Sequence, residues 1–260
     1  PTFRLFLWIC AYFDLEVSNA DVSTAYLNAP ADKDIYMKCD KDLLQKLKEL
    51  KKTLHGNERH RVNRLIIRLE KGESLLLLKA IYGSKSAGRQ WFLDIDAFLK
   101  LIGFVSNKAA PCFYSIIIGK DFVILLLYVD DIIIGATTTA LKVKYYDLLR
   151  KKYKMTFNEI LTDFLNIALT RDRAKRQYHM SQAAYVEAFH ETFQLPKDAS
   201  VQTPFTENLR IPSTERSDLT PAQRAYVRNF PFRKLIGVVL YCNICTMPGI
   251  SYAVSNLAKF

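Results

Sequence analysis

Apolar and polar positions repeat along this chain with two different periods, and each period predicts a different kind of element. Apolar side chains at Trp91, Ile95, Phe98 and Leu99 follow the i, i+4, i+7 and i+8 spacing of a helix with one buried face. The same kind of spacing over residues 141–149 predicts a second amphipathic helix. The sequence therefore predicts two helices that each cover a common core.

Short apolar runs bounded by turn residues predict strands. The runs are residues 15–20, 75–80, 113–118, 122–127 and 132–135. Further helices are expected over residues 3–13 and 182–193, and a hairpin over residues 164–181. Because helices and strands mix without a regular βαβ repeat, the predicted fold class is α+β.

Composition adds information on partners. The chain has 260 residues with 37 Lys and Arg against 26 Asp and Glu, a formal net charge of +11. This surplus favours polyanionic partners such as nucleic acid. Residues 46–71 carry nine of the basic residues against three Glu, although a solvated basic face explains that stretch equally well.

Several classes of protein are excluded. Aromatic and aliphatic residues along the whole chain exclude disorder for most of it. No apolar stretch reaches the ~20 residues of a membrane span, so no membrane partner is expected. Five scattered Cys do not form a disulfide scaffold, and Cys242 and Cys245 lack a second pair for zinc. An intracellular setting without a signal segment is expected.

Two adjacent carboxylates, Asp130 and Asp131, interrupt the apolar run of residues 122–135. Burying adjacent like charges costs several kcal/mol. Either the pair lies at an exposed hairpin tip, or a divalent cation neutralises it. A metal site needs a further oxygen ligand, and Asp21 is the candidate because it ends a short apolar strand. On composition alone, three other residues compete with it: Asp14, Asp34 and Asp121.

Four segments in order resemble copia-type retrotransposon reverse transcriptases. They are the YVDD tetrapeptide of residues 128–131, DVSTAYLNAPADKDIYM of residues 21–37, LLKAIYGSKSAGRQWF of residues 77–92, and RKLIGVVLYCNICTMPGISYAVSNLAKF of residues 233–260. The resemblance covers essentially the whole chain. It implies RNA-directed DNA synthesis on a right-hand polymerase palm, an antiparallel sheet backed by helices.

By this resemblance Asp21, Asp130 and Asp131 are the catalytic carboxylates and metal ligands. They would bind two Mg²⁺ ions, with Mn²⁺ as the alternative. Tyr26 matches the family's aromatic sugar gate, which leaves no space for a ribose 2′-hydroxyl. Without the family, Tyr26 would be read as an ordinary half-buried aromatic residue.

The same resemblance assigns a nucleotide-binding loop to Tyr82, Gly83, Lys85 and Arg89. Gly83 would permit close backbone approach, and the two cations lie near a helix N-terminus that favours anions. Solvated surface charge is the alternative interpretation of Lys85 and Arg89. The implied ligands are a dNTP and an RNA or DNA template with its primer.

The resemblance also implies a division of the chain. Residues 1–170 would form the palm with partial fingers, residues 171–204 a thumb-like hairpin and helix, and residues 205–260 a linker and connection segment leading toward an absent RNase H domain. The remaining fingers, the integrase and the RNase H regions of the polyprotein are expected outside this chain. A cytoplasmic virus-like particle is implied by the family alone.

Some positions depart from the family pattern. Gly88 stands where the family has Pro at the start of a helix, and Asn166 replaces a Gly. Asn is the least damaging substitute where φ is positive. Two alternatives to the polymerase therefore stay open. One is a degenerate, inactive fragment that only binds nucleic acid, and the other is a two-metal nuclease.

Overall fold

The computed structural model describes residues 1–194, 203–205 and 218–259, and these form two compact units, Pro1–Ile160 and Leu161–Phe260. The elements of the first unit are α1 (Thr2–Tyr12), β1 (Glu16–Val22), α2 (Ala25–Asn28), β2 (Pro30–Met37), α3 (Lys41–Thr53), α4 (Gly56–Glu70), β3 (Leu75–Lys79), α5 (Ala87–Leu101), β4 (Val105–Ser106), β5 (Phe113–Ile118), β6 (Asp121–Tyr128), β7 (Asp131–Ala136), α6 (Thr139–Lys152) and β8 (Met155–Asn158). The mixture of helices and strands confirms the predicted α+β class.

A six-stranded sheet is the centre of the first unit. Its strand order is β4-β5-β6-β7-β1-β8, and every neighbouring pair is antiparallel. The β6–β7 hairpin lies in the middle of the sheet. Strand β1 pairs with β7 on the side away from β6. A strand from the start of the chain therefore lies beside the segment that carries the two adjacent aspartates.

Helices α5 and α6 cover one face of this sheet. Trp91 and Leu99 of α5 and Tyr145 of α6 pack in one buried cluster with side chains of β6 and β7, among them Leu125 and Ile134. This arrangement confirms the antiparallel sheet and the two backing helices that the sequence predicts.

Helix α1 packs against the other face. A Cβ atom added to Gly135 of β7 would lie 2.9 Å from Cys10 Sγ of α1 and 3.3 Å from Leu15. Real Cβ contacts are almost never that short, so the glycine lets the helix lie close to the strand. Phe6 and Leu7 are buried in the same region. The faces of the sheet are thus covered by different helices.

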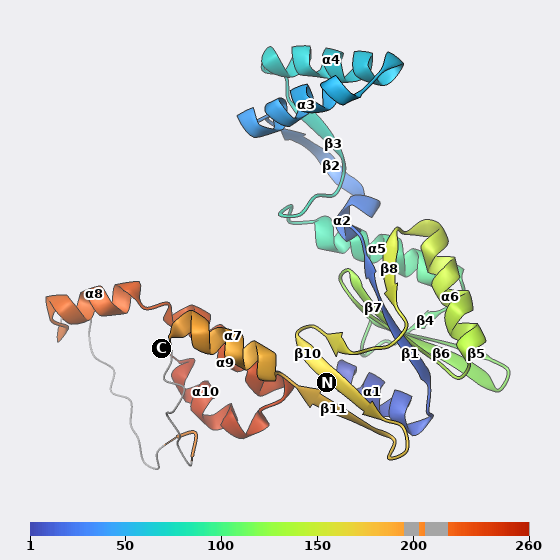
Figure 1. The fold of residues 1–260 in the computed structure, drawn as a ribbon, viewed down its shortest axis with the longest axis vertical. Helices are drawn as coiled ribbons and strands as arrows, with labels where there is room; N and C mark the ends of the chain where they lie inside the picture. Colours follow the sequence, from blue (N-terminus) through green and yellow to red (C-terminus); the bar gives the residue numbers. More distant parts are fainter. Residues whose placement is uncertain (195–202, 206–217, 260) are drawn as a thin grey trace. The chain divides into compact units, whose positions relative to one another are not determined.

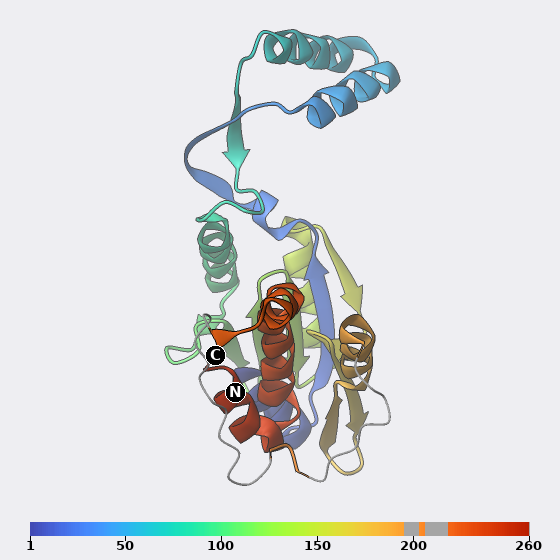
Figure 2. The ribbon, with the colours of Figure 1, turned by 90° about the vertical axis from the view of Figure 1, so that its left-hand side faces the viewer.

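Strands β2 and β3 form a separate antiparallel ribbon that carries the helix pair α3–α4 between them (Figures 1 and 2). The Asp40 side chain accepts a hydrogen bond from the Leu43 N–H at 2.7 Å and so caps α3. Gly56 begins α4. Most of the basic stretch of residues 46–71 therefore lies on these two helices.

The second unit contains a small sheet and several helices. Its elements are β9 (Asp163–Phe164), β10 (Ile167–Asp172), β11 (Gln177–Ser181), α7 (Ala183–Phe193), α8 (Pro221–Asn229), α9 (Phe232–Cys245), the 3₁₀ helix η2 (Pro248–Ile250) and α10 (Ser251–Leu257). The β10–β11 hairpin confirms the hairpin predicted over residues 164–181. The Tyr241 hydroxyl donates a hydrogen bond to the Leu165 carbonyl, which joins α9 to the small sheet.

The polar, proline-containing stretch of residues 195–225, which its composition favours as a linker, is only partly described. Residues 195–202 and 206–217 lie outside the described residues, but residues 221–225 begin α8, so the linker prediction is wrong there. The reason is a capping box: Thr220 and Gln223 exchange hydrogen bonds, and Pro221 takes the first helical position. None of the helices in the described ranges is both long and apolar enough to cross a lipid bilayer.

Candidate active site

The two adjacent aspartates lie at the exposed end of the β6–β7 hairpin. Tyr128 pairs with Asp131, so Val129 and Asp130 form a two-residue turn. Val129 has φ of 54°, a region that a β-branched residue rarely adopts. Such a conformation costs about 1–3 kcal/mol and persists only where surrounding contacts enforce it. The pair thus lies at a hairpin tip, and binding of a divalent cation there stays a prediction.

Trp91 supplies one of those contacts from the helix below. Its indole Nε1–H donates a hydrogen bond to the Val129 carbonyl oxygen at 2.6 Å, and its side chain is 2% exposed. The ring also meets Tyr153 edge to face at 5.2 Å between ring centroids. The turn is thus tied to a rigid part of the core.

Asp21 lies next to this turn. It is the direct partner of Asp131 across the β1–β7 pair, and the Val22 N–H donates to the Asp130 carbonyl oxygen at 2.8 Å. Side chains of directly opposed residues lie on the same face of a sheet. Because Ile132 of β7 belongs to the core beneath α5 and α6, Asp131 and Asp21 point to the opposite face. Three carboxylates from two distant segments of the chain thus lie close together at one end of the central strands. We call this end of the sheet the acidic edge.

The charges of these groups influence each other. The pKa of Asp21 is raised above its ordinary value, first by partial burial and second by the negative charge of Asp130. Oxygen donors under mutual repulsion are suited to a hard divalent cation.

The carboxylates do not form a closed cage. Within residues 1–194, 203–205 and 218–259, no group of three or more His, Cys, Asp or Glu side chains is arranged to hold a metal ion. In proteins, Mg²⁺ is commonly held by one or two carboxylates together with waters and substrate phosphates. Among the described residues, these carboxylates do not form a metal site from protein ligands alone.

Two tyrosines border the carboxylates. Tyr26 lies on α2 and Tyr82 on the loop before α5, and their ring centroids are 4.4 Å apart with planes inclined by 37°. The pKa of Tyr82 is raised by partial burial and then by the charges of Asp130, Tyr26 and Asp21, while a backbone hydrogen bond with Ala25 lowers it. The Tyr82 side chain therefore lies within the electrostatic influence of Asp130 and Asp21.

The other residues of the predicted nucleotide-binding loop, Gly83, Lys85 and Arg89, are exposed to solvent. Gly83 has φ of 91°, the left-handed region that favours glycine, and a Cβ there would meet nothing within 4 Å. Lys85 and Arg89 are exposed, and neither side chain has an ion pair or hydrogen bond in the part of the chain that the structure describes. The Ser86 hydroxyl donates to Asp32 at 2.7 Å and does not cap α5.

The structure thus brings Asp21, Asp130 and Asp131 together with Tyr26 and Tyr82. Lys85 and Arg89 flank the start of α5 without touching the carboxylates.

The carboxylates that compete on composition lie elsewhere. Asp121 is at the other end of β6, where it accepts a hydrogen bond from Thr137, and Asp34 is on the β2–β3 ribbon. The bond from Trp91 to Val129 was not predicted, because helical spacing shows only that Trp91 is buried.

Comparison with known proteins gives an independent result. The family described as reverse transcriptase (RNA-dependent DNA polymerase) matches residues 63–207 of this chain. The chain is 28% identical over 258 residues to the retrovirus-related Pol polyprotein from transposon TNT 1-94 of Nicotiana tabacum, an alignment that covers 99% of this chain and 18% of that protein.

Two further relatives are similar. The retrovirus-related Pol polyprotein from transposon RE1 of Arabidopsis thaliana is 29% identical over 71% of this chain and 12% of its own length. The putative transposon Ty5-1 protein YCL074W of Saccharomyces cerevisiae is 25% identical over 92% of this chain and 68% of its own length. This chain thus spans less than a fifth of the two plant polyproteins. No solved structure matches it.

Proposed function

The chain belongs to the reverse transcriptase (RNA-dependent DNA polymerase) family as a copia-type region, and from this premise we propose that it catalyses RNA-directed DNA synthesis. The proposed reaction transfers dNMP from a dNTP to the 3′-hydroxyl of a primer paired with an RNA or DNA template. The observation that carries the proposal is the register of β1 against β7, which sets Asp21 opposite Asp131 beside the Asp130 turn.

We assign the parts of a right-hand polymerase to these elements. The six-stranded sheet with α5 and α6 would be the palm, since it carries the carboxylates at the ends of its central strands β1, β6 and β7. The β2–β3 ribbon with α3 and α4 would belong to the fingers. The predicted thumb, residues 171–204, and the connection segment, residues 205–260, stay predictions. So do the further regions of the polyprotein.

The chain's own residues would act by position and charge. Asp21 and Asp130 would hold Mg²⁺, with Asp131 beside them on β7, and Mn²⁺ would be an alternative ion. When bound, two such ions favour the ionised 3′-hydroxyl and neutralise the triphosphate. Trp91 would keep the turn in the geometry that aims the Asp130 carboxylate, and catalysis would rest on this fixed placement.

The tyrosines and cations would bind the incoming nucleotide. Tyr26 is half-buried and supported by Tyr82, so its ring has a fixed place at which to exclude a ribose 2′-hydroxyl. Lys85 and Arg89 have no competing partner in the described chain and lie where the N–H groups of α5 also favour anions. They would contact the triphosphate.

Primer extension tests this proposal. A labelled DNA primer on an RNA template should be extended in the presence of Mg²⁺ and dNTPs, and Asp130→Asn should reduce incorporation by about 10²- to 10³-fold. Asp147→Asn is the matched control, because Asp147 is exposed on α6, outside both the carboxylate turn and the β2–β3 ribbon. It should leave the rate unchanged.

Three results would contradict the polymerase. Binding of primer–template without incorporation would favour a degenerate fragment, an alternative that the glycine at position 88 supports. Degradation of the template without synthesis would favour a two-metal nuclease. Equal loss of incorporation in Asp130→Asn and Asp147→Asn would show that the reaction does not depend on the carboxylates of the β6–β7 turn.

A further inference from the structure

Helix α4 presents a row of positive charge on its free side. Arg61, Arg64 and Arg68 follow the spacing i, i+3 and i+7, which places them on one side of α4. Lys71, the residue directly after the helix, continues this spacing at i+10. All four are exposed. The buried residues of α4, Ile66 and Leu69, lie on the other side. We call the four cations the basic ridge.

The helix pair concentrates the charge of the whole chain. Residues 41–71 contain ten Lys and Arg against four Asp and Glu, which leaves six of the chain's eleven net positive charges. Lys48 forms an ion pair with Glu70 at 2.7 Å, and Arg68 forms one with Glu73 at 2.6 Å. By contrast, the side chains of Arg61, Arg64 and Lys71 have no ion pair or hydrogen bond among the described residues. Three ridge cations are therefore available to an outside partner.

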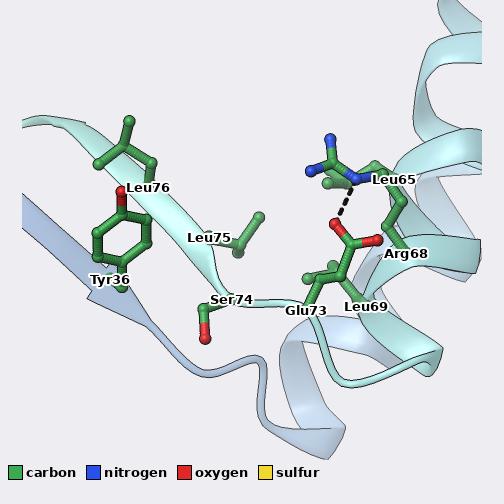
Figure 3. Close-up of a pocket in the computed structure, with 8 residues that line it drawn as sticks. All are labelled: Tyr36, Leu65, Arg68, Leu69, Glu73, Ser74, Leu75 and Leu76. Carbon is green, nitrogen blue, oxygen red and sulfur yellow. Dashed lines mark hydrogen bonds and ion pairs between the residues drawn. The ribbon is translucent and has the colours of Figure 1, made fainter.

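A pocket of about 220 Å³ adjoins the ridge at Arg68. It lies between the end of α4 and the β2–β3 ribbon, and Figure 3 shows Tyr36 and Leu76 side by side on the ribbon at one end of it. The pair are direct cross-strand partners, and Tyr36 is 64% exposed. The lining residues are Tyr36, Leu65, Arg68, Leu69, Glu73, Ser74, Leu75 and Leu76.

We propose that the basic ridge and the Tyr36 pocket bind an unpaired nucleic-acid strand, with phosphates on the ridge and a base against the Tyr36 ring. A charged track beside an exposed aromatic ring on an apolar floor is the combination that holds single strands without reading their sequence. A lipid surface fits less well, because a helix that binds a membrane surface buries a broad apolar face. The exposed side of α4 is mostly charged, with Ile67 as an exposed large apolar residue.

The placement relates this surface to the candidate active site. The β2–β3 ribbon begins at Pro30, directly after α2, and Pro30 pairs with Lys79, shortly before the Tyr82 loop. A strand bound along the ribbon would therefore run from the helix pair toward the two tyrosines. Naming this strand the template rests on the proposed function, whereas the binding itself does not.

Fluorescence anisotropy with a labelled 20-nucleotide oligo(dT) and the full chain, in EDTA without dNTP, tests the proposal. Combining Arg61→Ala, Arg64→Ala and Lys71→Ala should weaken binding 10- to 100-fold at low salt. It should also lower the slope of log K against log salt by about 2, since each lost single-strand contact removes about 0.7. Tyr36→Leu should weaken binding about tenfold and leave the salt slope unchanged.

The control removes the same charge elsewhere on the first unit. Lys108, Lys120 and Arg150 are exposed, and their combined replacement by Ala should leave binding within about twofold. Equal weakening by the two triple variants would overturn the proposal, because it would show dependence on net charge alone. So would ridge-dependent binding to phosphatidylserine vesicles without any effect on the oligonucleotide. Failure of primer extension with ridge-dependent binding intact would count against the proposed function only.

Discussion

At the scale of single residues, the strained turn at Val129 and its support by Trp91 join the core to the carboxylates. We predict that Trp91→Phe, which keeps an aromatic ring and removes the donor, lowers the incorporation rate about tenfold. The affinity for primer–template should change by less than twofold, because Trp91 is buried and cannot touch nucleic acid. Single-turnover kinetics and anisotropy measure the two quantities.

Phe98→Leu is the control for that variant. Phe98 lies on the same helix and meets Tyr153 edge to face at 5.6 Å, but it makes no bond to the turn. It should reduce the free energy of unfolding by about 1–2 kcal/mol, as Trp91→Phe does, without slowing incorporation. Equal slowing in both variants would assign the effect to general destabilisation.

A second prediction concerns the repulsion between Asp21 and Asp130. Asp21→Asn removes one charge of the pair, so in EDTA it should raise the free energy of unfolding, by no more than about 0.5 kcal/mol because Asp21 is exposed and screened by water. Excess Mg²⁺ should stabilise the natural chain and have little effect on the variant. Urea unfolding with and without Mg²⁺ measures both, and equal stabilisation by Mg²⁺ would remove Asp21 from the metal site.

At the scale of elements, the start of α5 carries Gly88, one of the positions at which the resemblance implies a departure from the family pattern. Gly88 has an ordinary negative φ, and a Cβ there would lie 3.7 Å from Tyr26 Oη, an ordinary contact. We therefore predict that Gly88→Ala raises the free energy of unfolding by about 0.5–1 kcal/mol through helix propensity. Gly83→Ala makes the same chemical change where φ is 91°, and it should destabilise the chain. Thermal unfolding compares the two.

The elements also show what the sequence could and could not predict. Helix α5 followed from a helical spacing with one buried face. The strands of the β6–β7 hairpin followed from continuous apolar runs, which are buried on both faces of the sheet. Asn166 has φ of 59°, as a residue replacing glycine requires. By contrast, the bond between Trp91 and Val129 spans 38 residues, and only the packed fold brings its ends together. Helix α8 begins inside the polar stretch that the composition favours as a linker, although Thr220 and Pro221 are residues typical of a helix start.

At the scale of the whole molecule, the two compact units predict where the chain can be divided. The buried cluster beneath α5 and α6 runs from Val22 to Tyr153, so it lies wholly within residues 1–160. We predict that a fragment of residues 1–160 folds alone, unfolds cooperatively and keeps the Mg²⁺ response of the full chain. Circular dichroism during heating, with and without Mg²⁺, measures this.

A fragment of residues 1–170 is the sharper comparison, because it ends where the resemblance places the palm boundary. It would retain β9 and most of β10 but lose β11, whose pairing with β10 covers five residue pairs. Unpaired strand edges promote association, so this longer fragment should be the less soluble of the two. If residues 1–170 instead fold more stably than residues 1–160, then β9 and β10 belong with the large sheet, and the functional boundary lies after them.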